Sequence, residues 1–175
     1  MQSPPWRAGG HPTLRPGGQY YRPMPVAPPK RILIVRISAL GDIVFCTSLL
    51  EGLRRAYPDA HISWLAKPGF GSVLEGDPRL NEILPLAADA LDTLAGLRGA
   101  LRQLRAERTY DWVIDAQGLL KTRLLARMAP AQHRIGFKSK EPGAFLLDEL
   151  HEKGGLPALI SSEYRYLAQQ LTGAD

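Results

Sequence analysis

The chain has 175 residues and a formal net charge of +5 at pH 7. This length fits one ordinary domain with its own hydrophobic core. The single cysteine, Cys46, excludes an intrachain disulfide and a cysteine-based metal cluster, and it is typical of a cytoplasmic protein. No apolar run approaches the ~20 residues that a membrane-spanning helix needs. The basic balance favours an anionic partner, although tails are often basic too, and nucleic acid is not expected.

Residues 1–29 are rich in proline, glycine and arginine and show no apolar period. We therefore expect a disordered tail, followed by one folded domain over residues 30–175. The tail lacks the apolar core of a signal peptide. Two interpretations stay open: translation starts at Met24, or the arginines of the tail contact an acidic membrane surface.

The first predicted elements are a strand, a tight turn and a helix. Lys30–Ile37 is a short β-branched and apolar run, typical of a strand that is buried on both faces of a parallel sheet. Ser38-Ala39-Leu40-Gly41-Asp42 supplies small residues and a glycine, which suit a sharp turn open to a ligand. A helical pattern begins at Ile43, and this start places Asp42 at or near the helix N-cap.

The rest of the chain alternates predicted strands and helices. Further strands are predicted at residues 61–66, 81–86, 111–115 and 133–137, and helices at residues 70–75, 91–104, 119–128 and 157–171. The apolar segment 145–150 is expected to be helical, and Gly173 is expected to end the last helix. This alternation predicts an α/β fold with a Rossmann-like, doubly wound parallel sheet.

Common site motifs are absent. No G-x-G-x-x-G follows the first strand and no G-x-x-x-x-G-K-[ST] occurs, so neither a dinucleotide nor a Walker phosphate site is supported. The four histidines lack zinc-ligand spacing, and no serine lies in a nucleophile elbow. We therefore expect no metal and no cofactor.

Polar residues follow the predicted strands at their carboxyl ends, which meet at one edge of a parallel sheet. One or two carboxylates among several cations suit an anionic substrate whose hydroxyl must lose a proton. The residues at these ends are Ser38, Gly41 and Asp42 after the first strand, Lys67 after the second, Asp115, Gln117, Gly118 and Lys121 after the fourth, and Lys138 and Lys140 after the fifth.

Simpler interpretations of these residues remain open at this point. Asp42 is either a plain N-cap or a general base aimed into the crevice. A helix N-terminus favours the ionised carboxylate, so a base there needs an opposing influence such as desolvation. Lys121 and Arg123 equally suit a solvated helix face, and Asp115 equally suits a cap of the following helix.

Two stretches resemble the signatures of a known family. Residues 32–44 resemble the opening motif of the ADP-heptose:lipopolysaccharide heptosyltransferases, which belong to glycosyltransferase family 9. Residues 110–121 resemble the second N-terminal signature of that family, and residues 133–137 fit the segment that follows. The resemblance runs from Lys30 to the end of the chain and is nearest to heptosyltransferase I, which adds the first heptose to Kdo.

The resemblance implies a GT-B fold, in which two Rossmann-like domains face a cleft. This chain would be the N-terminal, acceptor-binding domain, and the C-terminal domain, which binds the donor, would be absent. The implied partners are ADP-heptose as donor and a Kdo-lipid A acceptor, joined by an inverting transfer that is not metal-dependent. Since that acceptor is a lipid, the resemblance also suggests peripheral contact with the inner face of the inner membrane.

The resemblance also implies roles for single residues. Asp42 matches the general base, which takes the proton from the attacking acceptor hydroxyl. Gly41 would let the backbone approach the sugars, and Lys121 matches a basic position suited to Kdo carboxylates or lipid A phosphates. Ser38 and Gln117 would be hydrogen-bonding neighbours, and Gly118 completes the same substrate-binding turn.

An inverting transfer holds donor and acceptor together in near-attack geometry. We therefore expect negligible transferase activity from these 175 residues alone. One alternative is a non-catalytic module that binds an anionic glycolipid. A second alternative is a different nucleotide-binding α/β domain, which the missing phosphate-loop motifs disfavour. The donor could also be another nucleotide sugar, because donor choice would reside in the absent domain.

Overall fold

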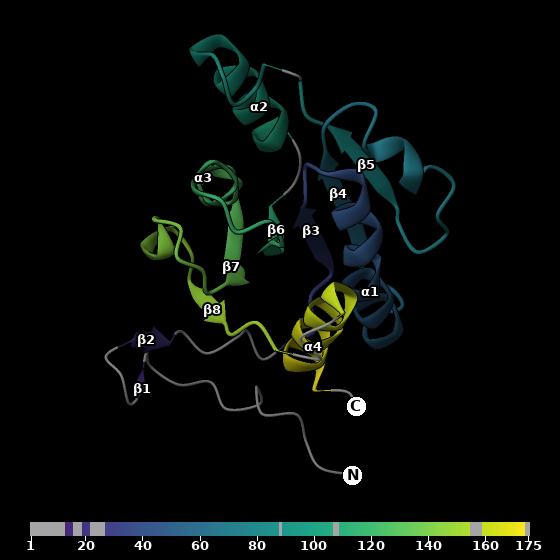
Figure 1. Ribbon diagram of the computed structural model, residues 1–175, viewed down its shortest axis with the longest axis vertical. Helices are drawn as coiled ribbons and strands as arrows, with labels where there is room; N and C mark the ends of the chain where they lie inside the picture. The colour runs from purple at the N-terminus through teal and green to yellow at the C-terminus, as the bar shows by residue number, and fades with distance from the viewer. Residues whose placement is uncertain are drawn as a thin grey trace.

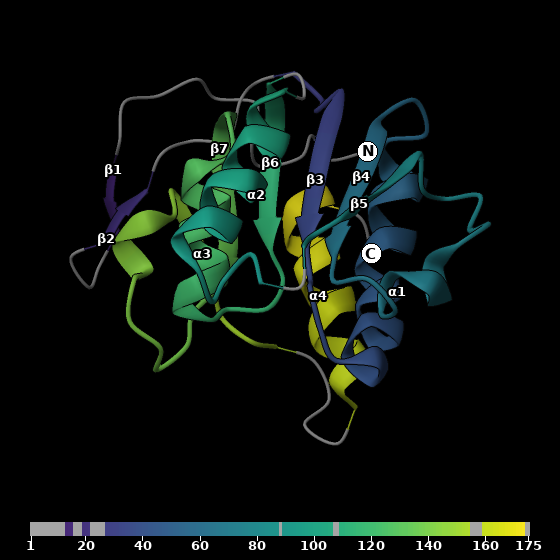
Figure 2. The same ribbon diagram turned by 90° about the horizontal axis from the view of Figure 1, so that it is seen from above.

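A computed structural model describes residues 13–15, 19–21, 27–87, 89–106, 109–154 and 159–173. Its centre is a six-stranded sheet in which every neighbouring pair of strands is parallel (Figures 1 and 2). The strand order is β5-β4-β3-β6-β7-β8. The strands are β3 (Arg31–Val35), β4 (His61–Ala66), β5 (Glu82–Pro85), β6 (Tyr110–Asp115), β7 (Ala131–Phe137) and β8 (Glu149–His151).

Helices cover both faces of the sheet (Figure 1). The helices are α1 (Leu40–Ala56), α2 (Leu94–Ala106), α3 (Leu120–Met128) and α4 (Ile160–Thr172), with short 3-10 turns η1 (Gly71–Leu74) and η2 (Ala144–Leu146). Two hydrophobic cores lie beneath them, one on each face of the sheet, and alternate residues of a strand point into different cores. In β3, Ile32 and Ile34 pack with α1 and α4, whereas Leu33 and Val35 pack with α2 and α3. Burial of both faces explains why this strand is a continuous apolar run.

The winding of the chain reverses between β3 and β6. From β3 the chain moves through α1 to β4 and β5 on one side, and then returns across the sheet through α2 to β6 on the other side. The carboxyl ends of β3 and β6 therefore flank a topological switch point, where open α/β sheets bind their ligands. In Figure 2 the arrows of β3 and β6 point the same way.

The structure confirms the expected fold class, and strands and helices occupy most of the predicted places. The helix predicted from Ile43 begins earlier, at Leu40, with Ala39 as the N-cap residue. Asp42 is thus in the first helical turn and is not the N-cap. Helix boundaries depend on backbone geometry more than on the spacing of apolar residues. The apolar spacing alone therefore predicted the start of α1 too late in the chain.

The segment 145–150 was expected to be helical, and this prediction is wrong. It contains the 3-10 turn η2 and then the edge strand β8, which pairs with β7 through Ile135 and Glu149. A three-residue edge strand is too short to carry an alternating pattern, so tertiary pairing decides its conformation.

The tail predicted as disordered is described only in small part. Residues Thr13–Arg15 (β1) and Gln19–Tyr21 (β2) form an antiparallel pair. The remaining residues up to 26 lie outside the described part of the chain, so the expected disorder stays a prediction. Residues 155–158, where the last helix was expected to begin, also lie outside it. That helix ends as predicted at Gly173, whose φ is +66°.

Candidate functional site

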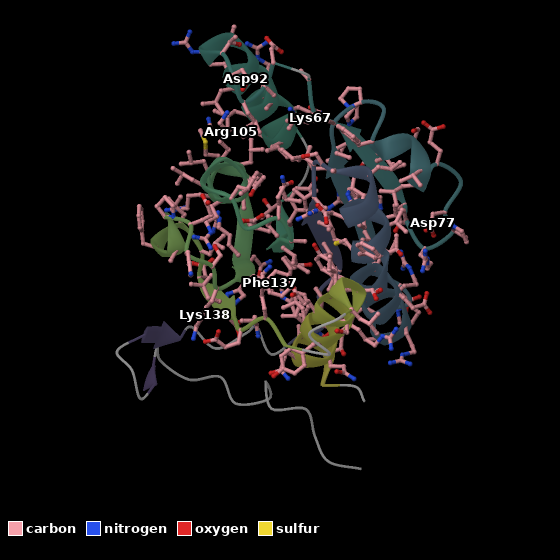
Figure 3. All side chains as sticks on the ribbon, viewed as in Figure 1. Lys67, Asp77, Asp92, Arg105, Phe137 and Lys138 are labelled. Carbon is pink, nitrogen blue, oxygen red and sulfur yellow. The ribbon has the colours of Figure 1, made fainter. Side chains whose placement is uncertain are left out.

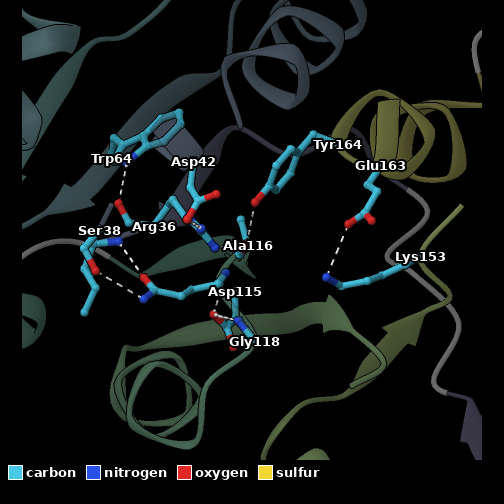
Figure 4. Close-up of polar contacts among 12 residues, drawn as sticks. Arg36, Ser38, Asp42, Trp64, Asp115, Ala116, Gly118, Lys153, Glu163 and Tyr164 are labelled. Carbon is cyan, nitrogen blue, oxygen red and sulfur yellow. Dashed lines mark hydrogen bonds and ion pairs between the residues drawn. The ribbon is translucent and has the colours of Figure 1, made fainter. Parts of the chain in front are cut away.

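The candidate site lies where β3 and β6 end, and two turns lead there into α1 and α3. Gln117 joins these turns because its side-chain oxygen accepts a hydrogen bond from the backbone amide of Ile37 at 3.0 Å. The amide nitrogen of the same side chain donates to the Ser38 hydroxyl at 3.4 Å (Figure 4). The structure thus brings Ser38 and Gln117 together, as the sequence predicted. The Ser38–Ala39 peptide bond is cis.

Asp115 shapes the second turn from within the protein. Its side chain is fully buried, and its Oδ1 accepts hydrogen bonds from the backbone amides of Gln117 and Gly118, both at 3.1 Å. Gly118 adopts a φ of +78°, which a side chain would resist, so a glycine is needed in this turn. Asp115 does not cap α3 directly, because the N-cap residue of that helix is Leu119.

The Asp115 carboxyl group has an unusual electrostatic environment. Burial raises its pKa, and the hydrogen bonds from Gly118, Thr122 and Gln117 lower the pKa without offsetting this effect. Its second oxygen, Oδ2, is buried without a hydrogen-bond partner. A protonated carboxyl would not leave a charge uncompensated in the core. We read Asp115 as a structural group of the turn, since the side chain has no access to a ligand.

Asp42, in the first turn of α1, is connected through Arg36 to the turn that contains Gln117. The Arg36 guanidinium forms an ion pair with Asp42 Oδ2 and donates a hydrogen bond to the backbone oxygen of Ala116 at 3.2 Å (Figure 4). Arg36 is nearly buried, whereas the Asp42 side chain is 38% exposed. The carboxylate is therefore held from behind by a fixed cation while it remains accessible from solvent.

The ion pair engages only one oxygen of the Asp42 carboxylate. Within the described residues no hydrogen bond reaches its Oδ1, which leaves that oxygen for a ligand. Gly41 is exposed beside it, and a Cβ atom at this position would meet nothing within 4 Å. The space above the first turn of α1 is therefore open, which is compatible with the predicted close approach of a sugar.

Two aromatic side chains fix the backbone that carries Arg36. The Trp64 indole N–H donates to the backbone oxygen of Arg36 at 3.0 Å, and the Tyr164 hydroxyl donates to that of Ala116 at 3.4 Å (Figure 4). Both side chains are buried, and burial raises the pKa of the Tyr164 hydroxyl. Burial likewise raises the pKa of the nearby Cys46 thiol, so this cysteine is not an active nucleophile.

Arg36 was not among the residues predicted for the site. The signal available in the sequence was a charged residue between Val35 and Ile37, in a run that is otherwise apolar. Such a residue at the end of a buried strand needs a partner, and the partner, Asp42, is six positions later. The sequence does not reveal this pairing, because it depends on where α1 begins.

The predicted cations converge less closely than the sequence suggested. The Lys121 ammonium is 60% exposed and forms an ion pair with Asp92 at 3.1 Å, outside the network around Gln117. Lys138 pairs with Glu152, and Figure 3 shows it well apart from Lys67. Such exposed pairs exchange readily with solvent, so Lys121 remains available to an anion.

A solvated helix face was one of the interpretations left open for Arg123, and the structure contradicts it. The side chain is fully buried, and its Nη1 donates to the backbone oxygens of Glu141 at 2.7 Å and Pro142 at 2.9 Å. Its Nη2 donates to the Phe137 oxygen at 3.1 Å and the Ser139 hydroxyl at 2.9 Å. Arg123 therefore holds the loop after β7 against α3, and its charge serves the fold.

Chemically, the site offers one accessible carboxylate, a hydroxyl, a side-chain amide and an open backbone edge. These groups suit proton removal from a hydroxyl that other polar groups hold in place. Among the described residues, no group of three or more His, Cys, Asp or Glu side chains could hold a metal ion. None of the helices in the described part of the chain is long and apolar enough to cross a bilayer.

Comparison with known proteins shows similarity to one family. Residues 98–175 match the profile of glycosyltransferase family 9 (heptosyltransferase). The chain is 34% identical to lipopolysaccharide heptosyltransferase 1 of Pseudomonas aeruginosa over 103 residues, which are 55% of this chain and 29% of that protein. It is 28% identical to lipopolysaccharide heptosyltransferase 2 of Salmonella typhimurium over 141 residues, or 79% of this chain and 39% of that one.

A solved structure gives the same relation for the fold. The E. coli heptosyltransferase WaaC, in complex with ADP-2-deoxy-2-fluoro heptose, superposes with a TM-score of 0.70 at 24% identity. The superposition covers 83% of this chain and 49% of that one. The chain thus spans less than half the length of these relatives. In these matched parts the chain is similar in sequence to glycosyltransferase family 9, and its fold resembles that of the solved heptosyltransferase.

Proposed function

We propose that this chain is the acceptor-binding part of a heptosyltransferase of lipopolysaccharide inner-core biosynthesis. The reaction would transfer heptose from ADP-heptose to a Kdo-lipid A acceptor. The observation that carries the proposal is the exposed Asp42 carboxylate at the switch point between β3 and β6, beside Ser38 and Gln117. The higher identity to a heptosyltransferase 1 than to a heptosyltransferase 2 supports Kdo as the acceptor sugar.

In this mechanism Asp42 is the general base. The acceptor hydroxyl gives its proton to Oδ1 while its oxygen attacks the anomeric carbon of the heptose. The bond from that carbon to the phosphate oxygen breaks on the opposite face, and ADP leaves with the electron pair, which inverts the configuration. Arg36 would keep the carboxylate oriented through Oδ2, so that the side chain loses little freedom on binding.

The remaining predicted residues would bind the acceptor. Ser38 and Gln117 present a hydroxyl and an amide that already share a hydrogen bond, and a sugar hydroxyl could join it. Gly41 and Gly118 keep the backbone of both turns close to the ligand. Lys121 would leave Asp92 for a Kdo carboxylate or a lipid A phosphate, because the pair it now forms is exposed.

The proposal is tested by titrating the purified chain with a soluble Kdo-bearing acceptor analogue. We expect saturable binding, weakened about twofold to fivefold by Lys121→Ala, since an exposed charge contributes up to about 1 kcal/mol. Asp42→Ala should change the affinity less, because a base acts mainly in the transition state. Lys30→Ala is the matched control: Lys30 is an exposed lysine before β3, at the opposite edge of the sheet.

The result that contradicts the proposal is a folded chain, by circular dichroism, that does not bind the analogue. Equal weakening by Lys121→Ala and Lys30→Ala would also argue against a specific site and indicate general attraction of anions. Binding of a free nucleotide in place of the analogue would favour a nucleotide-binding α/β domain. Tight acceptor binding with no transfer after the chain is joined to a donor-binding domain would favour a non-catalytic glycolipid-binding module.

A further inference from the structure

A polar pocket lies between α1 and α4, on the face of the sheet away from α2 and α3. Its volume is about 490 Å³, which is within the usual size of a small-molecule site. The two helices lie side by side in Figures 1 and 2, and the small residues Gly52 and Ala168 meet where they touch. Neither the fold nor the proposed acceptor site explains the polar side chains around this pocket.

The pocket is separate from the candidate site. The α1 residues that line it repeat at helical spacing from Thr47 to Arg55, so they form one stripe along the helix. Asp42, in the first turn of α1, precedes this stripe. At a rise of about 1.5 Å per residue, Arg55 lies roughly 20 Å further along the helix than Asp42. A ligand in the pocket would therefore not compete with an acceptor for the Asp42 carboxylate.

Arginines from three separate segments line the pocket. They are Arg55 on α1, Arg165 on α4 and Arg79 in the loop before β5. Among the described residues of the lining, the carboxylate is that of Glu51. Guanidinium groups match phosphate oxygens with paired hydrogen bonds, and a phosphate monoester offers three such oxygens and up to two negative charges. This lining therefore favours a ligand with a phosphate group.

The Arg79 guanidinium is already held in place. Asp77 accepts hydrogen bonds from its Nε at 2.9 Å and its Nη2 at 2.7 Å, which fixes the plane of the group. Arg54 holds the backbone of the same residue, because its Nε and Nη2 donate to the Arg79 oxygen at 3.0 Å and 2.8 Å. Only Nη1 reaches α1, where it contacts Glu51 Oε2 at 3.0 Å. A cation fixed in this way loses little freedom when it binds an anion.

Glu51 occupies the place of an anion in this pocket. Its side chain is 62% exposed and that of Arg79 is 32% exposed, so their ion pair exchanges readily with solvent. Arg165 is also exposed, and its side chain makes no ion pair or hydrogen bond within the described residues. A bound phosphate would replace the Glu51 carboxylate at Arg79 and gain Arg165 as a second partner. Glu51 is therefore an internal competitor of the ligand.

The rest of the lining suits a sugar better than a nucleobase. Three hydroxyl groups and one amide complete it, from Thr47, Ser48, Thr172 and Gln169. Such groups donate to and accept from the hydroxyls of a sugar. The described residues of the lining include no aromatic ring and no large aliphatic side chain, so a base would have nothing to stack on.

We propose that the pocket between α1 and α4 binds a small phosphorylated sugar. The arginines would hold the phosphate group, and the hydroxyls and the amide would orient the sugar. This inference goes beyond the proposed function and does not depend on it, because the pocket and the candidate site lie at different parts of α1.

The test is a titration of the ¹⁵N-labelled chain with glucose 6-phosphate, followed by the backbone amide signals in NMR spectra. We expect saturable shifts concentrated in residues 47–55 and 165–172. Inorganic phosphate and glucose should each bind at least about tenfold more weakly, since each offers only part of the contacts. The salt concentration is kept near the physiological value, so that distant charges are screened.

Variants of the two groups that face the ligand should act in opposite directions. Arg165→Gln should weaken binding about tenfold, and Arg165→Lys about threefold, because lysine keeps the charge and loses the planar fork. Glu51→Gln should strengthen binding about threefold, since it removes the competing carboxylate. Both side chains are exposed, so the variants should fold, which circular dichroism verifies.

Matched controls separate the pocket from general attraction of anions. Arg127→Gln removes an exposed cation from α3, on the other face of the sheet, and Glu75→Gln removes an exposed carboxylate directly after η1. Neither residue lines the pocket. Both variants should bind glucose 6-phosphate like the wild type.

Several results would overturn the proposal. One is a folded chain without saturable shifts up to about 10 mM glucose 6-phosphate, a very weak affinity. Others are equal weakening by Arg165→Gln and Arg127→Gln, or equal affinity for inorganic phosphate. Tighter binding of AMP would assign the pocket to a nucleotide. Shifts confined to residues 38–42 and 117–121 would place the ligand in the candidate acceptor site, and a failure of acceptor binding there leaves the pocket result unaffected.

Discussion

Single side chains in this protein combine burial with charge, and Glu149 is the clearest case. Its carboxylate oxygens contact the Nε2 atoms of His133 at 2.9 Å and His151 at 3.0 Å. Burial alone would raise the pKa of Glu149. The hydrogen bonds and charges of the two histidines outweigh that effect and lower the pKa to about 2. The three residues therefore connect β7 and β8 at the edge of the sheet.

This shift predicts how stability depends on pH. A carboxyl whose pKa falls from about 4.3 to about 2 on folding contributes stability above the higher value. That contribution is lost as pH falls through this window, and we expect a loss on the order of 3 kcal/mol. Urea unfolding at several pH values measures it. Glu149→Gln should remove most of this dependence, whereas the exposed Glu75→Gln should retain it; equal slopes for both would contradict the assignment.

At the scale of elements, the closest contact between helices is that of α1 with α4. Gly52 on α1 faces Ala168 on α4, and a Cβ atom at Gly52 would lie 2.4 Å from the Ala168 Cβ. Tyr164, on the same helix α4, reaches the backbone of the candidate site. The close packing of these two helices therefore supports the position of the turn after β6.

Two glycine-to-alanine changes in helices should act in opposite directions. Gly52→Ala should destabilise the protein by about 1–3 kcal/mol, because steric overlap exceeds the gain in helix propensity. Gly99→Ala, on α2, should stabilise it by about 0.5–1 kcal/mol, since its Cβ would meet nothing within 4 Å. Denaturant unfolding of both variants measures the free energies of unfolding. A stabilising Gly52→Ala would show that α1 and α4 are less closely packed than described.

At the scale of the whole molecule, one sheet couples two separate cores. Trp64 and Trp112 are buried on the face covered by α1 and α4, and Leu104 is buried on the face covered by α2 and α3. Every strand from β3 to β7 contributes to at least one of these cores. Loss of packing on one face should therefore unfold the other face as well.

Leu104→Ala tests this coupling. The change should cost about 2–5 kcal/mol, as expected for a fully buried leucine. The near-ultraviolet circular dichroism of Trp64 and Trp112, on the opposite face, should report the same lowered midpoint as the far-ultraviolet signal. Ile160→Ala, at an exposed position, is the control and should shift neither midpoint much. Separate transitions for the two signals would show that the faces unfold independently.

Much of the fold could be predicted because many of its elements are determined by residues that are close together in the sequence. The apolar run of β3, the alternation of strands and helices, and Gly173 after α4 follow from side-chain burial and backbone freedom. The predictions that are wrong depended on contacts distant in sequence. Glu149–His151 form the edge strand β8 by pairing with β7, and Arg123 is buried because four acceptors at the end of β7 and in the following loop surround it.

The candidate site divides in the same way. The sequence by itself determined which residues follow β3 and β6, and therefore that Ser38, Asp42 and Gln117 share one edge of a parallel sheet. Only the tertiary structure decided that Arg36 holds Asp42, and that Lys121 lies apart from both. An ion pair depends on the strand order and on the helix start, and side-chain spacing along the chain specifies neither.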